Sequence, residues 1–502
     1  NRIIQCMKEI LKRCIFMNKK ILSAILTAGM FFLAASSAFA LPTLSFDEYV
    51  SLSKSKNTTA EIQNKIDTIL NTPVVDNSFG SEDVLPHTMK VVNWNLEGGA
   101  QIHQVSALFL NGDKVISLAD EKILKDREKK IALQTQIKSL QRPDIIFLTD
   151  VDWGRPESGY KNVAYELAHA LGYNYAFGVD FIGTDPYTLG VQPDYEGKYN
   201  KEINKSQYRG LSGHAILSKY PLSNVRIIRL PDTYNWYDDE KEYAKDMASM
   251  KEKNLPVKPE PTDVKIGGRI ALLADTTLPG DVKTTLIAIE TEDRTKPKNR
   301  AIQVQYFLSR IKDISNPVVI GANLNTNNQD TSPNDPKRFF RKNFDGQNMI
   351  KNISAKFVQN GSIISSATGV FNSSRVKNDP TSPSVPIFAN NKEKATFDLF
   401  QDFRFDDKEI FEFKRERTIG DSASYDNYLG TTNERGLKGF VPTYSKKALI
   451  GYDEYKLDWF FVKPDEVLYP YNPKTLDMFS TAFAKQISSH NPMTIELHIK
   501  EK

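Results

Sequence analysis

The stretch VVNWNLEGG at residues 91–99 gives the clearest indication of the fold. A β-branched run ends there in an amide and a carboxylate two residues apart, and two glycines follow at once. Alternation along a strand puts the side chains of Asn95 and Glu97 on the same face, and the glycines allow the backbone to turn away. The stretch therefore predicts a strand whose end presents oxygen ligands to a hard cation.

A second strand-like run, DIIFLTD at residues 144–150, also ends in a carboxylate. Mg²⁺ usually takes one or two protein carboxylates and keeps several waters. Glu97 and Asp150 would meet this requirement if their strands were neighbours. We therefore expect Glu97, Asp150 and Asn95 to bind Mg²⁺ or Mn²⁺.

A third run, GANLNT at residues 321–326, follows the apolar segment Pro317–Ile320. Alternation again directs two amides, Asn323 and Asn325, to one face at the carboxyl end of a strand. We expect both amides to belong to the same site as the carboxylates.

Two further candidates lie late in the sequence. Asp458 stands inside the apolar run LDWFFV at residues 457–462, where a buried acid needs a partner. His490, in SSHNP at residues 488–492, precedes the last strand-like run. A carboxylate can orient an imidazole for acid–base chemistry, so we expect Asp458 and His490 to form a catalytic pair.

Strand-like runs recur along the rest of the chain, with helical patterns between several of them. Strands are predicted at Met89–Trp94, Asp144–Leu148, Ala215–Ser218, Val225–Leu230, Arg269–Ala274, Thr284–Ile289, Pro317–Ile320, Lys456–Val462 and Thr494–Ile499. Helices are predicted at Arg127–Leu140, Asn162–Leu171 and Lys298–Ile311. Strands and helices mixed in this way indicate a layered α/β domain.

The first 40 residues are typical of a leader. Residues 1–16 are interpreted as an extension upstream of the true start, and residues 17–40 combine a basic start, an apolar run and an A-F-A site. This pattern is typical of a secretory signal peptide. The alternative is a membrane anchor, but the apolar run is short for a span of about 20 residues. We expect cleavage after Ala40, a periplasmic or secreted bacterial protein, and no transmembrane segment after cleavage.

Composition changes when the leader is set aside. Residues 1–40 carry six of the 66 Lys and Arg residues and one of the 62 Asp and Glu residues, so the remainder carries 60 basic and 61 acidic side chains. Both cysteines, Cys6 and Cys14, also lie in the leader, which excludes disulfides and thiolate metal sites from the mature chain. A nearly neutral protein has no strong global field for nucleic acid, although basic patches at residues 337–342 and 414–417 leave a secreted nuclease as an alternative.

The mature chain is divided in the following way. Residues 41–85 are predicted to form an N-terminal helical segment and linker, and residues 86–502 an α/β domain. Insertions are expected at about residues 238–263, which are dense in charge, and 327–450, which are too long for an ordinary connection. Both are interpreted as surface elaborations, with substrate recognition as the alternative for the second.

Six motifs in order resemble the endonuclease/exonuclease/phosphatase superfamily of DNase I-like phosphoesterases. They are WNxEG, DIIFLTD, GxAILSKYPL, GxNxN, LDWFFV and SxHxP, spread over about residues 88–500. Segments at residues 152–154, 173–179, 213–230 and 267–274 resemble an exported bacterial branch of that family. The resemblance implies a four-layer α/β sandwich of two packed mixed β-sheets flanked by helices, with the site at one end.

The same resemblance implies a mechanism. An activated water attacks phosphorus in line, one or two Mg²⁺ ions neutralise charge, and a His–Asp pair stabilises or protonates the phosphoryl oxygens. The residues that match the family positions are Asn95, Glu97, Asn325, Asp458 and His490, with Asp150 in place of a metal-binding Glu.

Four positions depart from the family pattern. Asn323 takes the place of the Asp that positions or deprotonates the attacking water, and an amide cannot accept that proton. Ser489 replaces the Asp that usually precedes the catalytic His, and Glu290 stands where many members have a second His. His214 stands where this branch usually has Asn, and it is a candidate to enter the pocket and compensate.

Two functions from different classes remain open. The first is an exported, metal-dependent phosphoesterase acting on a phosphate ester of unidentified class, expected to be a monomer. The second is a catalytically degenerate family member that binds a phosphorylated ligand or protein partner without hydrolysis. The Asp458–His490 pair favours the enzyme. The changes at Asn323, Ser489 and Glu290 favour the binding protein, because each general acid or base contributes roughly 10²–10⁴-fold to a rate.

Overall fold

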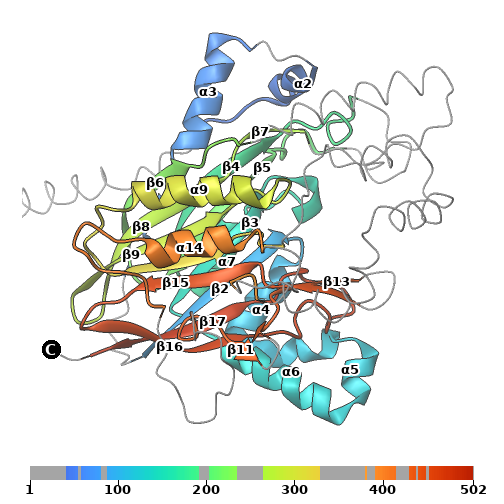
Figure 1. Cartoon of the computed structure of the whole chain (residues 1–502). Coiled ribbons are helices and arrows are strands. Elements are labelled where there is room, and N and C mark those ends of the chain that lie inside the picture. Colours follow the sequence, from blue (N-terminus) through green and yellow to red (C-terminus); the bar gives the residue numbers. More distant parts are fainter. Residues whose placement is uncertain are drawn as a thin grey trace, which may run out of the picture. The chain divides into compact units, whose positions relative to one another are not determined.

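Two mixed β-sheets form the framework of this computed structural model (Figure 1). The structure describes residues 41–54, 58–80, 88–191, 203–233, 264–327, 379–381, 391–413, 429–436, 439–447 and 452–500. Residues 1–40, with the predicted leader and upstream extension, and the predicted insertion at 238–263 lie outside the described residues.

The larger sheet has eight strands, in the order β1-β4-β5-β3-β2-β17-β16 with β7 paired to β4. Their bounds are β1 Val74–Asp76, β2 Thr88–Gly98, β3 Ile145–Trp153, β4 Asn174–Gly183, β5 Leu211–Ser218, β7 Lys265–Gly267, β16 Leu468–Thr475 and β17 Met493–Ile499. β2 and β3 are parallel, and the other neighbours are antiparallel.

The smaller sheet has five strands, in the order β15-β10-β9-β8-β6. Their bounds are β6 Leu222–Arg229, β8 Ile270–Leu278, β9 Val282–Glu290, β10 Val318–Asn323 and β15 Asp458–Lys463. β9 and β10 are parallel. Two short hairpins join β11 Arg435–Gly436 to β12 Gly439–Phe440, and β13 Tyr444–Lys447 to β14 Tyr452–Tyr455.

Helices cover the outer faces of the sheets (Figure 1). The α-helices are α2 Phe46–Lys54, α3 Ala60–Asn71, α4 Ile102–Asn111, α5 Glu121–Lys125, α6 Arg127–Leu140, α7 Val163–Leu171, α9 Pro297–Arg310 and α14 Lys394–Asp402. Short 3₁₀ turns lie at Gly112–Lys114, Ile116–Leu118 and Pro156–Ser158. Among the described helices, none has the length and apolar character needed to cross a membrane.

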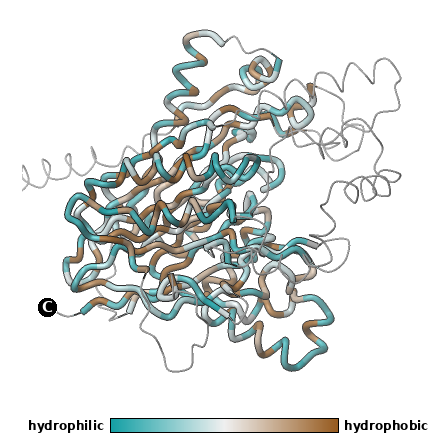
Figure 2. The backbone as a smooth tube through the Cα atoms, in the orientation of Figure 1, coloured by the Kyte–Doolittle hydropathy of each residue, from teal (hydrophilic) through white to brown (hydrophobic). Residues whose placement is uncertain are grey.

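Alternation along the strands separates two hydrophobic cores, because successive side chains point to opposite faces. In β8, Leu272 faces the core between the sheets, whereas Leu273 faces the core under α9 and α14. In β2, Val91 faces the core between the sheets, and the Trp94 ring packs edge-on against Phe109 of α4 on the opposite face. Hydrophobic residues concentrate along these strands (Figure 2). The predicted four-layer sandwich of two packed mixed sheets is confirmed.

The two sheets approach each other closely where their parallel pairs meet. A Cβ at Gly321 in β10 would lie 2.6 Å from side-chain atoms of Phe147 in β3, so only glycine fits there. Beside it, the buried Asn93 amide in β2 donates a hydrogen bond to the carbonyl of Ala322 at 3.1 Å. The absence of a side chain at Gly321 therefore lets β3 approach β10, and the Asn93 hydrogen bond joins β2 to β10.

The N-terminal segment departs from the predicted helix and linker. Two separate helices, α2 and α3, are followed by the strand β1, which extends the larger sheet along β4. The Asn77 amide then bonds both backbone groups of Leu222, at 2.8 Å each. Residues 41–80 are thus integrated with the sheet, because Val74 and Val75 complete an edge that the sequence pattern did not reveal.

The predicted insertion at residues 327–450 is described only in part, and one part of it is not a surface elaboration. Helix α14 buries Phe397 and Phe400 in the core beneath the smaller sheet. The Phe400 ring stacks on Phe461 of β15 with centroids 3.8 Å apart. The polar residues around this helix concealed its apolar face, so the sequence did not indicate that α14 completes the outer layer.

We expect Gly321→Ala to destabilise the protein, because the new methyl group would have to displace the Phe147 ring. Overpacking of this kind costs about 1–3 kcal/mol, which urea unfolding measures as a lower midpoint. Gly436→Ala is the matched control, since a Cβ there lies 3.9 Å from its nearest atom. Equal stability of Gly321→Ala and wild type would contradict the close approach, whereas Phe147→Leu should restore part of the loss in Gly321→Ala.

Candidate active site

A cavity of about 920 Å³ opens at the end of the sandwich where both parallel strand pairs reach their carboxyl ends. Six of the eight predicted site residues line it, namely Asn95, Glu97, Asp150, Asn323, Asn325 and His490. Asp458 lies directly behind His490. The sequence motifs therefore converge on one site, from strands of both sheets.

A β-bulge interrupts the larger sheet at each of three acids on the cavity wall. Glu97 lies where the pairing of β2 with β3 shifts register, Asp150 where β3 pairs with β5, and Asp180 where β4 pairs with β5. The backbone of Glu97 and Asp150 is left-handed, with φ of +46° and +50°, which is uncommon for residues other than glycine. Bulges redirect side chains next to active sites, and here they turn acids toward the cavity.

Glu97, Asp150 and Asn95 present oxygen ligands of the kind that Mg²⁺ and Mn²⁺ prefer. Asn95 Oδ1 accepts a hydrogen bond from the Glu97 backbone at 2.9 Å, and Glu97 Oε2 accepts one from the Ser489 backbone at 2.5 Å. Burial and the nearby Asp180 charge raise the pKa of Asp150, and no donor among the described residues bonds its carboxylate. The charges of Arg269, Lys265 and Arg155 only partly offset this rise. A carboxylate in these surroundings fits a divalent cation.

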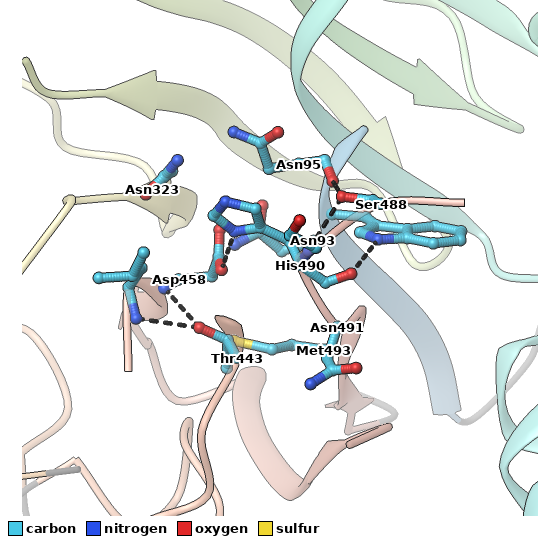
Figure 3. Close-up of polar contacts among 12 residues, drawn as sticks. Asn93, Asn95, Asn323, Thr443, Asp458, Ser488, His490, Asn491 and Met493 are labelled. Atoms are coloured by element: carbon cyan, nitrogen blue, oxygen red, sulfur yellow. Dashed lines mark hydrogen bonds and ion pairs between the residues drawn. The ribbon is translucent and has the colours of Figure 1, made fainter. Parts of the chain in front are cut away.

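The predicted pair of Asp458 and His490 is present (Figure 3). His490 Nδ1 lies 2.7 Å from Asp458 Oδ2, and both side chains are almost fully buried. The Thr443 hydroxyl accepts a hydrogen bond from the Asp458 backbone at 2.9 Å, and the Trp94 indole donates to the His490 carbonyl at 2.9 Å. Backbone anchoring from two directions therefore fixes the imidazole at the cavity wall.

Charge on the imidazole is set by its partner. Burial disfavours a cation at His490, but the Asp458 carboxylate and its hydrogen bond outweigh burial and raise the pKa of His490 to about 9. His490 is therefore an imidazolium at neutral pH. Its Nδ1 is directed at Asp458, which leaves Nε2 for an anionic group in the cavity.

The amides of the third motif are donors to Glu290. The parallel register of β9 and β10 places Asn323 opposite Glu290. Glu290 Oε1 lies 3.4 Å from Nδ2 of both Asn323 and Asn325, and Asn325 Nδ2 also donates to the Thr291 carbonyl at 2.8 Å. Burial raises the pKa of Glu290 to about 8. Beside Asn323, the carboxyl group is therefore supplied by Glu290 on the neighbouring strand β9.

Asp180 and Arg269 are cavity residues that the sequence reasoning missed. Arg269 is buried, and its Nη1 lies 3.0 Å from Glu290 Oε1 and 3.6 Å from Asp180 Oδ2. An acid inside the apolar run AFGVDFIG at residues 176–183 was the available signal for Asp180. Arg269 directly precedes β8, and the pairing of β8 with β9 brings it to Glu290. Packing of the two sheets then brings it to Asp180.

The hypothesis that His214 enters the pocket is not confirmed. Among the described residues, those that line the cavity do not include it. His214 is fully buried in β5, with a ring nitrogen within 4.8 Å of carboxylate oxygens of Asp180 and Glu290. Because Ile216, two residues further along β5, faces the core between the sheets, the His214 ring also lies between the sheets, behind Asp180 and Glu290 of the cavity wall.

Comparison with known proteins gives the following matches. No family model and no curated protein matches the chain. It is similar to the solved structure of an endonuclease/exonuclease/phosphatase from Beutenbergia cavernae DSM 12333, at 11% identity over 82% of this chain and 72% of that chain, with a TM-score of 0.33. It is also similar to the human Nocturnin catalytic domain with bound sulfate, at 13% identity over 86% of this chain and 97% of that chain, with a TM-score of 0.35. A third similar structure is a mannosyl-6-phosphatase from Bacteroides thetaiotaomicron VPI-5482, at 11% identity over 82% of this chain and 99% of that chain, with a TM-score of 0.35.

We expect Asp458→Asn to lower the pKa of His490 from about 9 toward or below its ordinary value near 6.5, because only the Glu97 and Glu290 charges then still oppose burial. Titration of the imidazole by NMR measures this shift, with the His498 signal as an internal control. A wild-type His490 that titrates near 6.5 would contradict the assignment.

The same pair should make stability depend on pH. A pKa raised by folding adds stability that is fully present below about pH 6.5 and is lost as the pH rises through about 9. The free energy of unfolding of the wild type should therefore fall across this window more steeply than that of Asp458→Asn. Urea unfolding at pH 6, 7.5 and 9 tests the expectation, and parallel curves for the two proteins would refute it.

Proposed function

We propose that this chain is an exported phosphoesterase that hydrolyses a phosphate ester with the help of a divalent cation, Mg²⁺ or Mn²⁺. The observation that carries the proposal is the juxtaposition of opposite charges in one cavity. An imidazolium, His490, stands opposite the carboxylates of Glu97 and Asp150. A phosphoryl group is an anion that such a cavity accepts only when a cation offsets the carboxylates.

Each side chain has a role in this proposal. Glu97, Asp150 and Asn95 would hold the cation, which when bound neutralises charge on the phosphoryl oxygens and polarises them. His490 would donate from Nε2 to a phosphoryl or leaving-group oxygen, and Asp458 keeps it charged and oriented. Asn323 and Asn325 would bind polar groups of the substrate or the attacking water.

A second function is supported by one specific observation. The Asn323 side chain accepts from the Asn325 backbone at 3.1 Å and donates toward Glu290, so it offers the attacking water no base. A protein with this change would bind a phosphorylated ligand or partner without hydrolysing it. Turnover by the wild-type protein distinguishes the two functions.

The test is hydrolysis of bis-p-nitrophenyl phosphate, p-nitrophenyl phosphate, plasmid DNA and sphingomyelin by residues 41–502 with Mg²⁺ or Mn²⁺. We expect turnover that chelator abolishes. His490→Ala should lower kcat by roughly 10²–10⁴-fold, because it removes the charged donor, and Glu97→Gln should raise the metal concentration required. His498→Ala, a histidine on β17 outside the cavity, is the matched control and should retain wild-type activity.

The outcomes separate the alternatives. Turnover that survives both His490→Ala and chelator would overturn the proposed site. Absence of turnover in the wild type, together with activity in Asn323→Asp, would establish the binding protein, because a carboxylate restored at that position can accept a proton from water.

A further inference from the structure

We propose a second cation site, formed by Asp180, His214 and Glu290, that binds a divalent transition-metal ion such as Mn²⁺ or Zn²⁺ in preference to Mg²⁺. The three residues come from β4, β5 and β9, so the site spans the gap between the two sheets. One ligand atom from each lies within 4.8 Å of the others, and the residues are 1%, 0% and 4% exposed. The inference concerns ion binding and stands whether or not the cavity hydrolyses phosphate esters.

Unpartnered polar atoms face this cluster. Within the described part of the chain, Glu290 Oε2 has no hydrogen-bond partner. Neither ring nitrogen of His214 makes a hydrogen bond of ordinary geometry, although backbone groups of Gly213 and Ile270 lie close enough to affect the imidazole. Buried polar atoms in native proteins are almost always bonded, and leaving them unpaired is costly. A metal ion bound to one ring nitrogen of His214 and to Glu290 Oε2 would pair two of these atoms and remove most of this cost. The unpaired atoms of His214 and Glu290 could therefore act as ligands of one ion.

The imidazole is in the form that a metal requires. Burial keeps His214 neutral by lowering its pKa to about 4, although the Asp180 charge acts in the opposite direction. A neutral imidazole offers a lone pair on one nitrogen. The ring would therefore bind an ion without first losing a proton.

Arg269 does not replace the proposed ion. Its guanidinium is divided among four carboxylates, with contacts of 2.9 Å to Asp293, 3.0 Å to Glu290, 3.6 Å to Asp180 and 3.8 Å to Glu292. The contact with Glu290 uses Oε1 and leaves Oε2 available. One positive charge shared by three buried carboxyl groups and the partly exposed Asp293 also leaves a negative potential that attracts a further cation.

The donor atoms select the class of ion. One imidazole nitrogen and two carboxylates suit Mn²⁺ and Zn²⁺, whereas Mg²⁺ favours oxygen ligands and retains several waters. Burial of all three side chains leaves little room for those waters. Asp180 and Glu290 line the cavity that His214 lies behind, so an ion would enter from the cavity.

Metal stoichiometry by equilibrium dialysis with Zn²⁺ tests the site directly. The double variant Glu97→Gln/Asp150→Asn disables the first proposed site, and we expect it to retain one bound Zn²⁺ per chain. Adding His214→Ala should remove that ion, and adding His214→Gln should weaken binding at least tenfold with less disturbance of packing. Circular dichroism confirms folding of each variant, and His498→Ala is the matched histidine control.

Pulsed EPR with Mn²⁺ identifies the ligand. In the double variant we expect a nitrogen coupling from one imidazole that persists in His490→Ala and disappears in His214→Gln. A double variant that binds no Zn²⁺, or a nitrogen coupling that depends on His490 instead, would overturn the proposal. If the wild type hydrolyses with Mg²⁺ and the double variant binds no Zn²⁺, this site is rejected and the proposed function is retained. If the double variant binds Zn²⁺ and the wild type shows no hydrolysis, the proposed function is rejected and this site is retained.

Discussion

The close approach of the two sheets is the constraint on which the rest of the structure depends. Gly321 in one sheet leaves space for Phe147 in the other, and the Asn93 amide bridges the gap beside them. Protein interiors tolerate such contacts only when shapes match to within a methyl group. Because this contact joins the two parallel strand pairs, it brings their carboxyl ends to one end of the sandwich, where separate polar residues become a single cavity.

At that end of the sandwich, acidic side chains outnumber the buried cationic ones among the described residues. Carboxylates come from both sheets, and their repulsion in a poorly solvated space is strong. The protein offsets it in two visible ways, by charging His490 through Asp458 and by dividing Arg269 among four acids. The pKa values of Asp150 and Glu290 remain raised, chiefly by burial and further by repulsion from neighbouring acids. The proposed cations would offset this imbalance, which no single residue accounts for.

Much of the fold was predictable, because apolar alternation reports burial directly. Arg127–Leu140 is helical as predicted, and the Asp458–His490 pair was deducible from a buried acid that needed a partner. The contacts of Asp180, His214 and Arg269 were not deducible. They depend on pairing between segments far apart in the chain and on bulges that interrupt the two-residue period. The burial of helix α14 was not predicted for a different reason, since the residues of its apolar face alternate with polar ones and polar segments surround it.

The three bulges have a consequence for how such a protein evolves. Each bulge shifts the register near the carboxyl end of its strand, and the strand pairing before the bulge is regular. A substitution at a bulged position therefore changes a side chain on the cavity wall and leaves the regular strand pairing before it in register. Lineages can exchange an acid for an amide, or a histidine for an acid, while the body of the sandwich stays the same. Backbone irregularities of this kind confine the effect of such exchanges to the rim of the cavity.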